Sequence, residues 1–335
     1  MEDAKYYNAA AIAMKSSYAK LSRSLEKYGS WKTVWENTKS APDPDKEYAK
    51  LTDLGIKLLL KEDDAYPTLL REIPLPPFGI YVLGNLECAD PAVAIIGTRA
   101  ATPQGKATAK TFASALAQAG IPIISGLALG IDAEAHRGAL DAGGKTIAVL
   151  GTPLDNFYPK QNERLAVEIL KNDGAVISEF PLGHPYHPSN FLARNRIVSG
   201  LSRGVLIVEA PERSGSLATA RFAIEQNRDI FVIPGNINLH NYKGSNSLIK
   251  SGAMLVTQPD DILEFLNIIS DDREGNLPEL SEEERLIIEA MKSGPISTEQ
   301  ILIATDSEIS KLNQLLALLT IKGIIKELNG KYTIH

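Results

Sequence analysis

Apolar residues recur through the middle of the chain in short runs, separated by stretches with helical spacing. Seven runs follow one another at regular intervals: 93–97, 122–126, 146–151, 175–180, 205–210, 230–235 and 253–257. Continuous apolar runs are typical of strands that are buried on both faces of a parallel sheet. Because helical patterns lie between the runs, the sequence predicts an α/β fold with one doubly wound, mostly parallel sheet.

The residues before this region predict a small helical cap. Three short segments have apolar positions at helical spacing: Ala9–Met14, Leu21–Tyr28 and Trp31–Trp35. We interpret Pro42 to Asp45 as a linker, which is followed by a helix over Lys46–Leu54, a strand over Ile56–Leu60 and a proline-rich approach to the sheet. The cap is expected to cover residues 1–65. Four aromatic residues could stack on bases but are more often core residues on short helices: Tyr6, Tyr7, Trp31 and Trp35.

A second unit is predicted over residues 280–335, after a polar connector at Asp271–Pro278. Three helices follow, the first with Ser281 as N-cap and Glu284 three residues later: Ser281–Lys292, Thr298–Ala304 and Ile309–Lys322. With a hairpin through Asn329-Gly330, they make the pattern of a winged helix. Winged helices often place the third helix in a DNA groove. Here that helix offers only Lys311 and Lys322, so contact with a protein, or no binding, is favoured.

Charge separates the middle region from its flanks. The 335 residues are 44% hydrophobic and 23% charged, with a net charge of −6. Residues 1–90 carry a net −2 and residues 261–335 a net −7, whereas residues 91–260 carry +3. A polyanion would therefore be attracted to the middle region and repelled by the C-terminal unit. The single cysteine, Cys88, excludes a disulfide framework, and the absence of a long apolar run or a signal peptide predicts a cytoplasmic protein without a membrane span.

The turns that follow the strands carry the candidate chemistry. In a parallel sheet these turns line the ligand crevice, so we expect the following residues to face one another: Gly97, Thr98, Arg99, Ser125, Gly126, Gly130 and Asp132. A second turn, Ser214-Gly215-Ser216, opens a helix, where free backbone N–H groups and hydroxyls form a plausible phosphate cradle. Arg194 and Arg196 lie on different sides of the helix after Phe191, so at most one is expected to contact a ligand while the other fixes the loop.

Several familiar sites are not supported, and no cofactor is expected. Gly143-Gly144-Lys145 imitates a nucleotide-triphosphate loop but leads into a strand. The glycines that a nicotinamide cofactor needs after Gly97 are missing. His184 and His187 lack metal-binding partners at ligand spacing. None of three candidate hydroxyls has a visible histidine base, which leaves little support for a nucleophilic triad: Ser125, Ser178 and Ser214.

The turns, in this order, resemble the DNA-processing protein A family, also called Smf. The resemblance spans about Tyr66 to Phe265 and rests on these motifs: Gly97-Thr98-Arg99, Ser125 to Asp132 with Ala135-His136, Gly151, Tyr158 to Asn162, Ser178 to Pro181, Phe191 to Ile197, Glu209-Ala210, Ser214 to Ser216, Pro234 to Asn236 and Gly244 to Asn246. It implies an extended Rossmann DNA-binding domain over residues 66–270, a SAM-like cap and a winged helix of the family's C-terminal type.

The resemblance also implies a function. Members are recombination mediators without enzymatic activity that bind single-stranded DNA, dimerise through the Rossmann domain and load the RecA recombinase during natural transformation. Carried over to this chain, Arg99 would clamp a phosphate, Lys160 would lie in the positive pocket, and Asn195 with the Ser214–Ser216 turn would shape it. Where members commonly have a Gly-rich hairpin in the cap, this chain has Lys15 to Tyr18.

An enzymatic alternative stays open at this point. The LOG family of nucleotide phosphoribohydrolases shares the broad sheet architecture and places a catalytic Glu two residues after a Thr. Here Arg221 occupies that distance from Thr219, and Glu225 lies a further turn along the predicted helix. Release of adenine from AMP, lost in Glu209→Gln, would favour the enzyme over the DNA binder.

Overall fold

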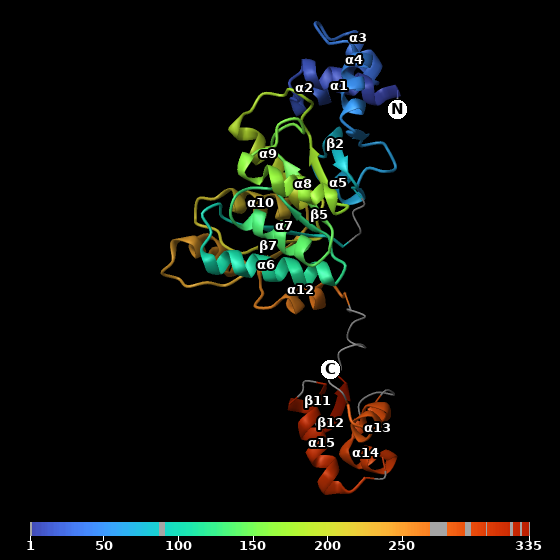
Figure 1. Ribbon diagram of the computed structural model, residues 1–335, viewed down its shortest axis with the longest axis vertical. Helices are drawn as coiled ribbons and strands as arrows, with labels where there is room; N and C mark the ends of the chain where they lie inside the picture. Colours follow the sequence, from blue (N-terminus) through green and yellow to red (C-terminus); the bar gives the residue numbers. More distant parts are fainter. Residues whose placement is uncertain are drawn as a thin grey trace. The chain divides into compact units, whose positions relative to one another are not determined.

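The computed structural model describes residues 2–86, 91–268, 280–291, 296–305, 307–321, 324–328 and 330–334. Cys88, the connector Asp271–Pro278, Lys322 and Asn329 lie outside the described residues, so the predictions that concern them stay predictions. The chain divides into two compact units, residues 1–268 and 269–335 (Figure 1). No helix within the described ranges has both the length and the apolar character needed to cross a membrane.

The first unit is built on a mixed, mostly parallel sheet of nine strands in the order β1-β2-β6-β5-β4-β3-β7-β8-β9. Its strands are β1 (Lys57–Leu60), β2 (Gly79–Gly84), β3 (Val93–Ile96), β4 (Ile123–Ser125), β5 (Thr146–Leu150), β6 (Ala175–Ser178), β7 (Gly204–Ile207), β8 (Asp229–Val232) and β9 (Met254–Leu255). The seven apolar runs correspond to β3 through β9 along the chain, and neighbouring strands from β6 to β9 in the sheet order pair in parallel. The predicted mostly parallel α/β sheet is confirmed.

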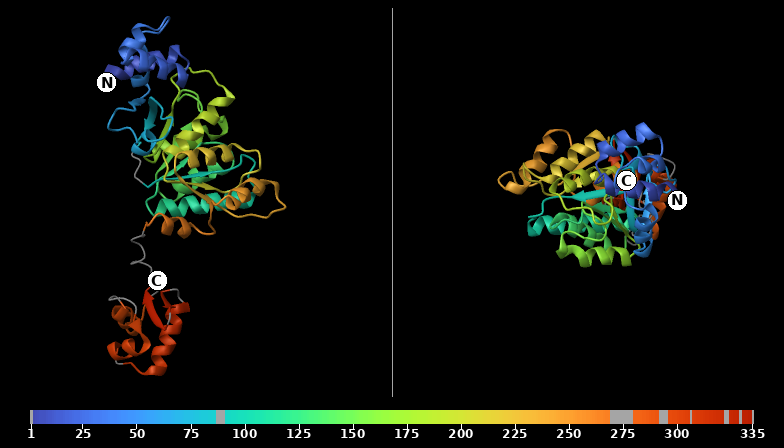
Figure 2. Two further views of the ribbon diagram at one scale, coloured as in Figure 1. Left: turned by 180° about the vertical axis from the view of Figure 1, so that it is seen from behind. Right: turned by 90° about the horizontal axis from the view of Figure 1, so that it is seen from above.

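Helices cover both faces of this sheet (Figures 1 and 2). They are α5 (Thr68–Arg71), α6 (Pro103–Gln118), α7 (Ile131–Asp141), α8 (Glu163–Lys171), α9 (Pro188–Gly200), α10 (Gly215–Glu225), α11 (Lys243–Lys250) and α12 (Pro259–Phe265), with short 3-10 turns η1 (Lys160–Asn162) and η2 (His240–Tyr242). Side chains alternate between the faces: Val93 and Ile95 of β3 pack with α6 and α7, whereas Ala94 and Ile96 pack with α9 and α10. Full burial on both sides explains the continuous apolar runs.

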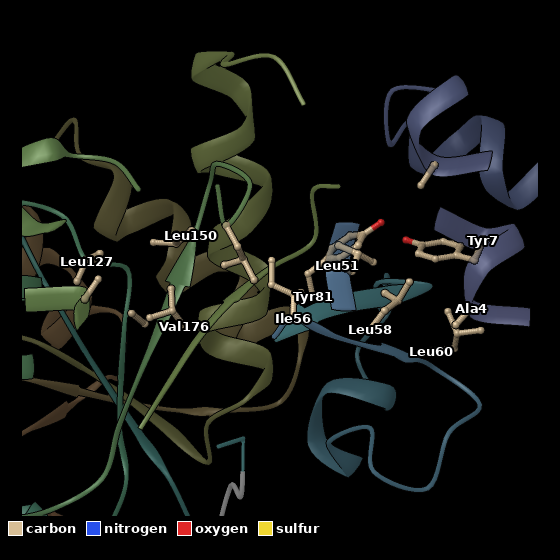
Figure 3. Close-up of a cluster of buried hydrophobic side chains, with 14 of the residues drawn as sticks. Ala4, Tyr7, Leu51, Ile56, Leu58, Leu60, Tyr81, Leu127, Leu150 and Val176 are labelled. Carbon is tan, nitrogen blue, oxygen red and sulfur yellow. The ribbon is translucent and has the colours of Figure 1, made fainter. Parts of the chain in front are cut away.

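The N-terminal helices share one apolar core with the sheet. They are α1 (Glu2–Ala13), α2 (Tyr18–Tyr28), α3 (Trp31–Glu36) and α4 (Pro44–Asp53). One apolar cluster runs from Tyr7 of α1 through Tyr81 of β2 to Val176 of β6 (Figure 3). Tyr7 and Trp31 are 1% and 4% exposed, so the core interpretation of these two aromatic residues is correct.

Two local predictions in this region are corrected. The stretch interpreted as a proline-rich approach contains β2, which pairs antiparallel with both β1 and β6 and thereby extends the sheet. The stretch interpreted as a linker begins α4: the side chain of Asp43 accepts hydrogen bonds from Asp45 N and Lys46 N, and Pro44 occupies the first helical turn. Asp at the N-cap followed by Pro is a helix-start signal, because neither position needs an intrahelical N–H partner.

The second unit contains α13 (Glu282–Met291), β10 (Ile296–Ser297), α14 (Thr298–Thr305), α15 (Ile309–Ile321), β11 (Ile325–Leu328) and β12 (Lys331–Ile334). Its strands form an antiparallel sheet in the order β10-β12-β11. The predicted capping box is present, because Ser281 N donates to Glu284 Oε2 at 2.9 Å and Glu284 N donates to Ser281 Oγ at 3.2 Å.

Candidate functional site

A cavity of about 420 Å³ opens at the carboxyl ends of β3, β4 and β7. We call it the carboxyl-end cavity. It is lined by the turn after β3, the turn after β4, the start of α7, one side of α9 and the start of α10. The lining residues are Ile96, Gly97, Thr98, Arg99, Gly126, Ala128, Asp132, Phe191, Leu192, Arg194, Asn195, Val198, Pro211, Arg213, Ser214, Gly215, Ser216 and Thr219. The predicted turns therefore meet at one edge of the sheet.

Nine of the twelve residues predicted for the site line this cavity: Gly97, Thr98, Arg99, Gly126, Arg194, Asn195, Ser214, Gly215 and Ser216. The other three do not. Ser125 is fully buried and its hydroxyl donates to Ile95 O at 2.7 Å. Gly130 precedes α7 at a φ of 82° and packs behind the Arg99 loop, where a Cβ would lie 2.4 Å from Thr98 O. Lys160 is exposed at the start of η1, beside Pro159, and its ammonium lies 3.7 Å from Glu163.

The exposed cations of the cavity lie on its rim. Arg99 and Arg213 are both exposed, and Arg99 lies over the ring of Phe191 at 5.9 Å. Arg213 directly precedes Ser214, the N-cap residue whose side chain accepts a hydrogen bond from Leu217 N at 3.4 Å. The first backbone N–H groups of α10 and the positive end of its dipole therefore face the cavity. Sequence reasoning did not single out Arg213, although its position just before a Ser-Gly-Ser N-cap was a usable signal.

Arg194 forms the buried floor of the cavity. It is 4% exposed, and its Nη1 donates to Gly126 O at 2.6 Å and also to Val149 O. Burial lowers the pKa of Arg194 to about 10, so the guanidinium still carries its charge at neutral pH. A side chain at position 126 would collide with this guanidinium, because a Cβ there would lie 2.6 Å from Nη1.

Asp132 lies beside Arg194 and supports the turn after β4. Its Oδ2 accepts hydrogen bonds from Gly126 N at 3.1 Å and from Ala128 N at 3.4 Å. Burial raises the pKa of the Asp132 carboxyl, and the positive charge of Arg194 and these backbone N–H groups act in the opposite direction. Asp132 therefore stabilises the turn after β4 through its hydrogen bonds.

Arg196 points away from the cavity into a buried ion pair. Its Nη2 and Nη1 lie 2.5 and 2.8 Å from the two carboxylate oxygens of Glu179, and its Nε donates to Leu75 O at 3.0 Å. As predicted, Arg194 and Arg196 lie on different sides of α9. Both are buried and fix backbone, and Arg194 alone of the two reaches the cavity wall.

An aromatic cluster adjoins the rim beside Arg99. Tyr158, Tyr186 and Phe191 lie with ring centroids 5.3 to 5.4 Å apart in tilted or edge-on pairs. Tyr158 and Tyr186 are 39% and 51% exposed. Tyr158 and Pro159 also line a small hollow that adjoins the larger cavity. The two share these lining residues: Arg99, Gly126, Ala128, Phe191 and Arg194. Tyr158 lies in the loop before η1, Tyr186 in the loop before α9 and Phe191 in α9 itself, so no spacing in the sequence reveals the cluster.

The histidines considered as metal ligands have local roles. The ring of His184 stacks on Phe180 at 4.6 Å, and His187 is the N-cap of α9, where its Nδ1 accepts from Ser189 N at 3.3 Å. In the described part of the chain no three His, Cys, Asp or Glu residues gather as a metal site.

Carboxylates needed for the hydrolase alternative lie away from the cavity. Glu225 and Arg221 are exposed on α10 and do not line it, and Glu209 is buried behind its wall. Asp132 is the one acidic residue among those that line the cavity in the described structure, and it is bonded to backbone amides.

Comparisons with known proteins identify relatives of this chain. The family model for DNA recombination-mediator protein A matches residues 57–267. Protein Smf from Escherichia coli is 45% identical over 210 residues, which are 62% of this chain and 56% of that protein. Protein Smf from Synechocystis is 44% identical over 218 residues, 64% of this chain and 54% of that protein. The chain thus spans little more than half the length of these two relatives.

Two solved structures share the fold. The crystal structure of DNA processing protein A (DprA) from Streptococcus pneumoniae has a TM-score of 0.62 and 41% identity, and the match covers 69% of this chain and 81% of that one. DprA from Helicobacter pylori, described for its single-stranded DNA binding mode, has a TM-score of 0.57 and 32% identity, and the match covers 63% and 95%. The chain belongs to the DprA/Smf family, the family of DNA recombination-mediator protein A.

Proposed function

We propose that this protein binds single-stranded DNA as a recombination mediator, without catalysis, and that the carboxyl-end cavity is its DNA site. The observation that carries the proposal is the meeting of three arginines with the start of α10 in one cavity: Arg99, Arg194 and Arg213. The family membership and the single-stranded DNA binding described for the Helicobacter pylori protein support it.

The polar part of the cavity suits a sugar-phosphate backbone. Exposed guanidinium groups on Arg99 and Arg213 can donate to phosphate oxygens, and the first N–H groups of α10 can donate beside them. Arg194 adds positive charge from the floor without leaving its backbone partners. Lys160, exposed next to Pro159 of the smaller hollow, extends the positive surface as a peripheral contact.

The aromatic cluster accounts for a preference for single strands. Unpaired bases have free faces that stack on tyrosine rings, whereas duplex bases are already stacked on each other. Tyr158 and Tyr186 present half-exposed rings next to the Arg99 side chain. One strand could therefore place a phosphate at Arg99 and an adjoining base on Tyr186.

The finer parts of the proposal rest on the family resemblance. We propose that the protein acts in the cytoplasm as a homodimer joined through the Rossmann domain, and that it loads RecA on DNA taken up during natural transformation. Two pockets on one dimer would raise the affinity for one strand through effective concentration. We further propose a SAM-like cap over residues 1–65, an extended Rossmann domain over 66–270 and a winged helix over 280–335.

The test is a comparison of single- and double-stranded oligonucleotides of one sequence by fluorescence anisotropy at two salt concentrations. We expect tighter binding of the single strand and an affinity that falls with salt, with a logarithmic slope of about −0.7 for each phosphate neutralised. Equal affinity for the duplex, or no salt dependence, would contradict the proposal. Adenine release from AMP, measured in parallel, would reopen the hydrolase alternative.

A further inference from the structure

Glu209 is a buried carboxylate that the DNA site described above does not use. It follows β7 and is 0% exposed. Each of its four side-chain hydrogen bonds in the described structure comes from a neutral donor. Oε2 accepts from Thr102 N at 3.1 Å and from Asn241 Nδ2 at 2.9 Å, and Oε1 accepts from Tyr242 OH at 3.1 Å and from the Thr102 hydroxyl.

These bonds hold both ends of the loop that carries Arg99. At its start, Thr98 N donates to the backbone oxygen of Glu209 at 2.8 Å. At its end, Thr102 donates twice to the Glu209 side chain and caps α6 by accepting from Gly105 N at 3.0 Å. Arg99 therefore stands in the middle of a short loop that is tied to one residue on both sides.

The middle of the same loop is held indirectly. Asn241 Nδ2 donates to Ala100 O at 3.0 Å as well as to Glu209 Oε2. The Glu209 carboxylate packs closely against the start of α6, because a Cβ on Gly105 would lie 2.2 Å from Glu209 Oε1. Without these bonds, the exposed Arg99 loop would sample many conformations, and DNA binding would have to order it at a cost in entropy.

We propose that Glu209 is a positioning residue that preorganises the Arg99 loop for the DNA backbone, and that Asn241 assists it. The proposal rests on the proposed function for its effect on DNA affinity, while the effect on the loop can be measured without DNA. Glu209 does not touch the ligand, because its side chain lies behind the cavity wall and all its described bonds are internal.

The first experiment is hydrogen–deuterium exchange on the full chain without DNA, comparing Glu209→Gln with the natural sequence. Glutamine has nearly the same shape, but it removes the negative charge that strengthens these four hydrogen bonds. Its NH2 group can replace Oε1 only if the hydroxyls of Thr102 and Tyr242 turn from donors into acceptors. We expect peptides over residues 97–105 to exchange several-fold faster. The matched control is Glu284→Gln, a buried carboxylate that caps α13 in the second unit and leaves this loop alone. Unchanged exchange over 97–105 would overturn the proposal, whatever the protein does with DNA.

The second experiment is a double-mutant cycle on single-stranded DNA affinity with Arg99→Ala. If Glu209 acts through Arg99, Glu209→Gln weakens binding about two- to thirty-fold in the natural background and adds little once Arg99 is gone. If the losses of binding free energy in the two single variants add up in the double variant, Glu209 has a general structural role and the proposal is overturned. If Glu209→Gln does not fold, Asn241→Ala replaces it in both experiments, since Asn241 is only partly buried and contributes no apolar core. Failure of the natural sequence to bind DNA would refute the proposed function and leave the exchange result to decide the role of Glu209.

Discussion

The sheet carries two hollows lined by glycines at opposite ends of its strands, and the larger of them is not the better anion site. The carboxyl-end cavity measures about 420 Å³ and the hollow at the amino ends of β4 and β5 about 700 Å³. The latter, here the amino-end hollow, is lined by Gly120, Gly143, Gly144 and Lys145. Its Gly-Gly-Lys sequence imitates a phosphate loop more closely than anything in the smaller cavity does.

Helix direction explains why the Gly-Gly-Lys segment does not make the amino-end hollow an anion site. α10 begins at the carboxyl-end cavity, so N–H groups and the positive end of its dipole face that cavity. α6 and α7 end at the amino-end hollow, so carbonyl groups and negative dipole ends face it. Lys145 there is paired with Asp173 at 3.0 Å, whereas Arg99 lies exposed against Phe191. The start of α10 and the exposed Arg99 are therefore the reasons for which we propose the DNA site at the carboxyl-end cavity and not at the amino-end hollow.

Acid should damage both hollows, because α7 runs between them and contains a buried histidine. Burial lowers the pKa of His136 to about 3, from about 6.5 in the unfolded chain. The folded state therefore keeps His136 neutral, and its contribution to stability is complete above pH ~6.5 and is lost as the pH falls toward 3. The loss could reach about 4 kcal/mol.

Urea unfolding at pH 7, 5 and 4 measures this effect, with His136→Gln as the comparison. The variant should be less stable at pH 7, because it loses the contact between Nδ1 and Thr146 Oγ1 at 2.7 Å. It should also lose less stability on acidification. The raised pKa of Asp132 acts with the opposite sign in both proteins, so it cancels in the comparison. Parallel pH profiles would contradict the assignment to His136.

Arg194→Met should lower the free energy of unfolding through the loss of contacts at the carboxyl-end cavity. The change leaves Gly126 O and Val149 O buried without their donor and removes the positive charge beside Asp132. We expect a loss of about 3 kcal/mol in the free energy of unfolding. Lys145→Met is the matched change at the other hollow, and it should cost less than about 1 kcal/mol because the Lys145–Asp173 pair is partly exposed. Similar losses in both variants would remove the contrast between the two hollows.

Arg99→Ala, compared with Lys145→Ala, tests which of the two hollows binds single-stranded DNA. Loss of one charge-assisted phosphate contact should cost about 2 kcal/mol, which is roughly thirty-fold in single-stranded DNA affinity. The salt slope should become shallower by about 0.7. Lys145→Ala should leave both quantities unchanged, since the amino-end hollow presents the wrong helix ends. An equal loss of affinity in Lys145→Ala would show that DNA binding follows charge without regard to helix direction.

Local rules were sufficient for much of this fold. The apolar runs predict β3 to β9 because burial on both faces leaves an uninterrupted signal. Ser281 and Glu284 predict the start of α13 because a capping box involves only neighbours in sequence. β2 was missed, because its surroundings are rich in proline and its partner β6 lies far away along the chain. The linker prediction at Asp43-Pro44 is wrong, because both residues favour a helix start.

The candidate site was predictable as a place but not as a set of contacts. Parallel topology brings the turns after β3, β4 and β7 to one edge, so nine of the named residues line one cavity. Spacing along a helix cannot say how deep a side chain lies, and so it did not show that Arg194 is buried beneath Gly126. The Glu209 network joins residues more than a hundred positions apart and leaves no local pattern.

The smallest expected effect concerns the aromatic cluster, which has no counterpart among the residues that line the amino-end hollow in the described structure, apart from Tyr66. Tyr66 is 1% exposed and bonded to Pro77 O, whereas Tyr186 is half-exposed. Tyr186→Leu should weaken single-stranded DNA binding about five-fold, which is at the low end of the effects measured for the stacking of one base. We expect a small effect because Tyr158 and Phe191 already cover part of the ring and leave only the rest for a base. Tyr186→Phe, which keeps the ring, should bind like the natural protein. The salt slope should stay the same in both variants, because no phosphate contact changes, and anisotropy titrations at two salt concentrations measure affinity and slope together. If Tyr186→Phe is as weak as Tyr186→Leu, the hydroxyl matters rather than the ring, and the preference for single strands must come from the arginines and the start of α10.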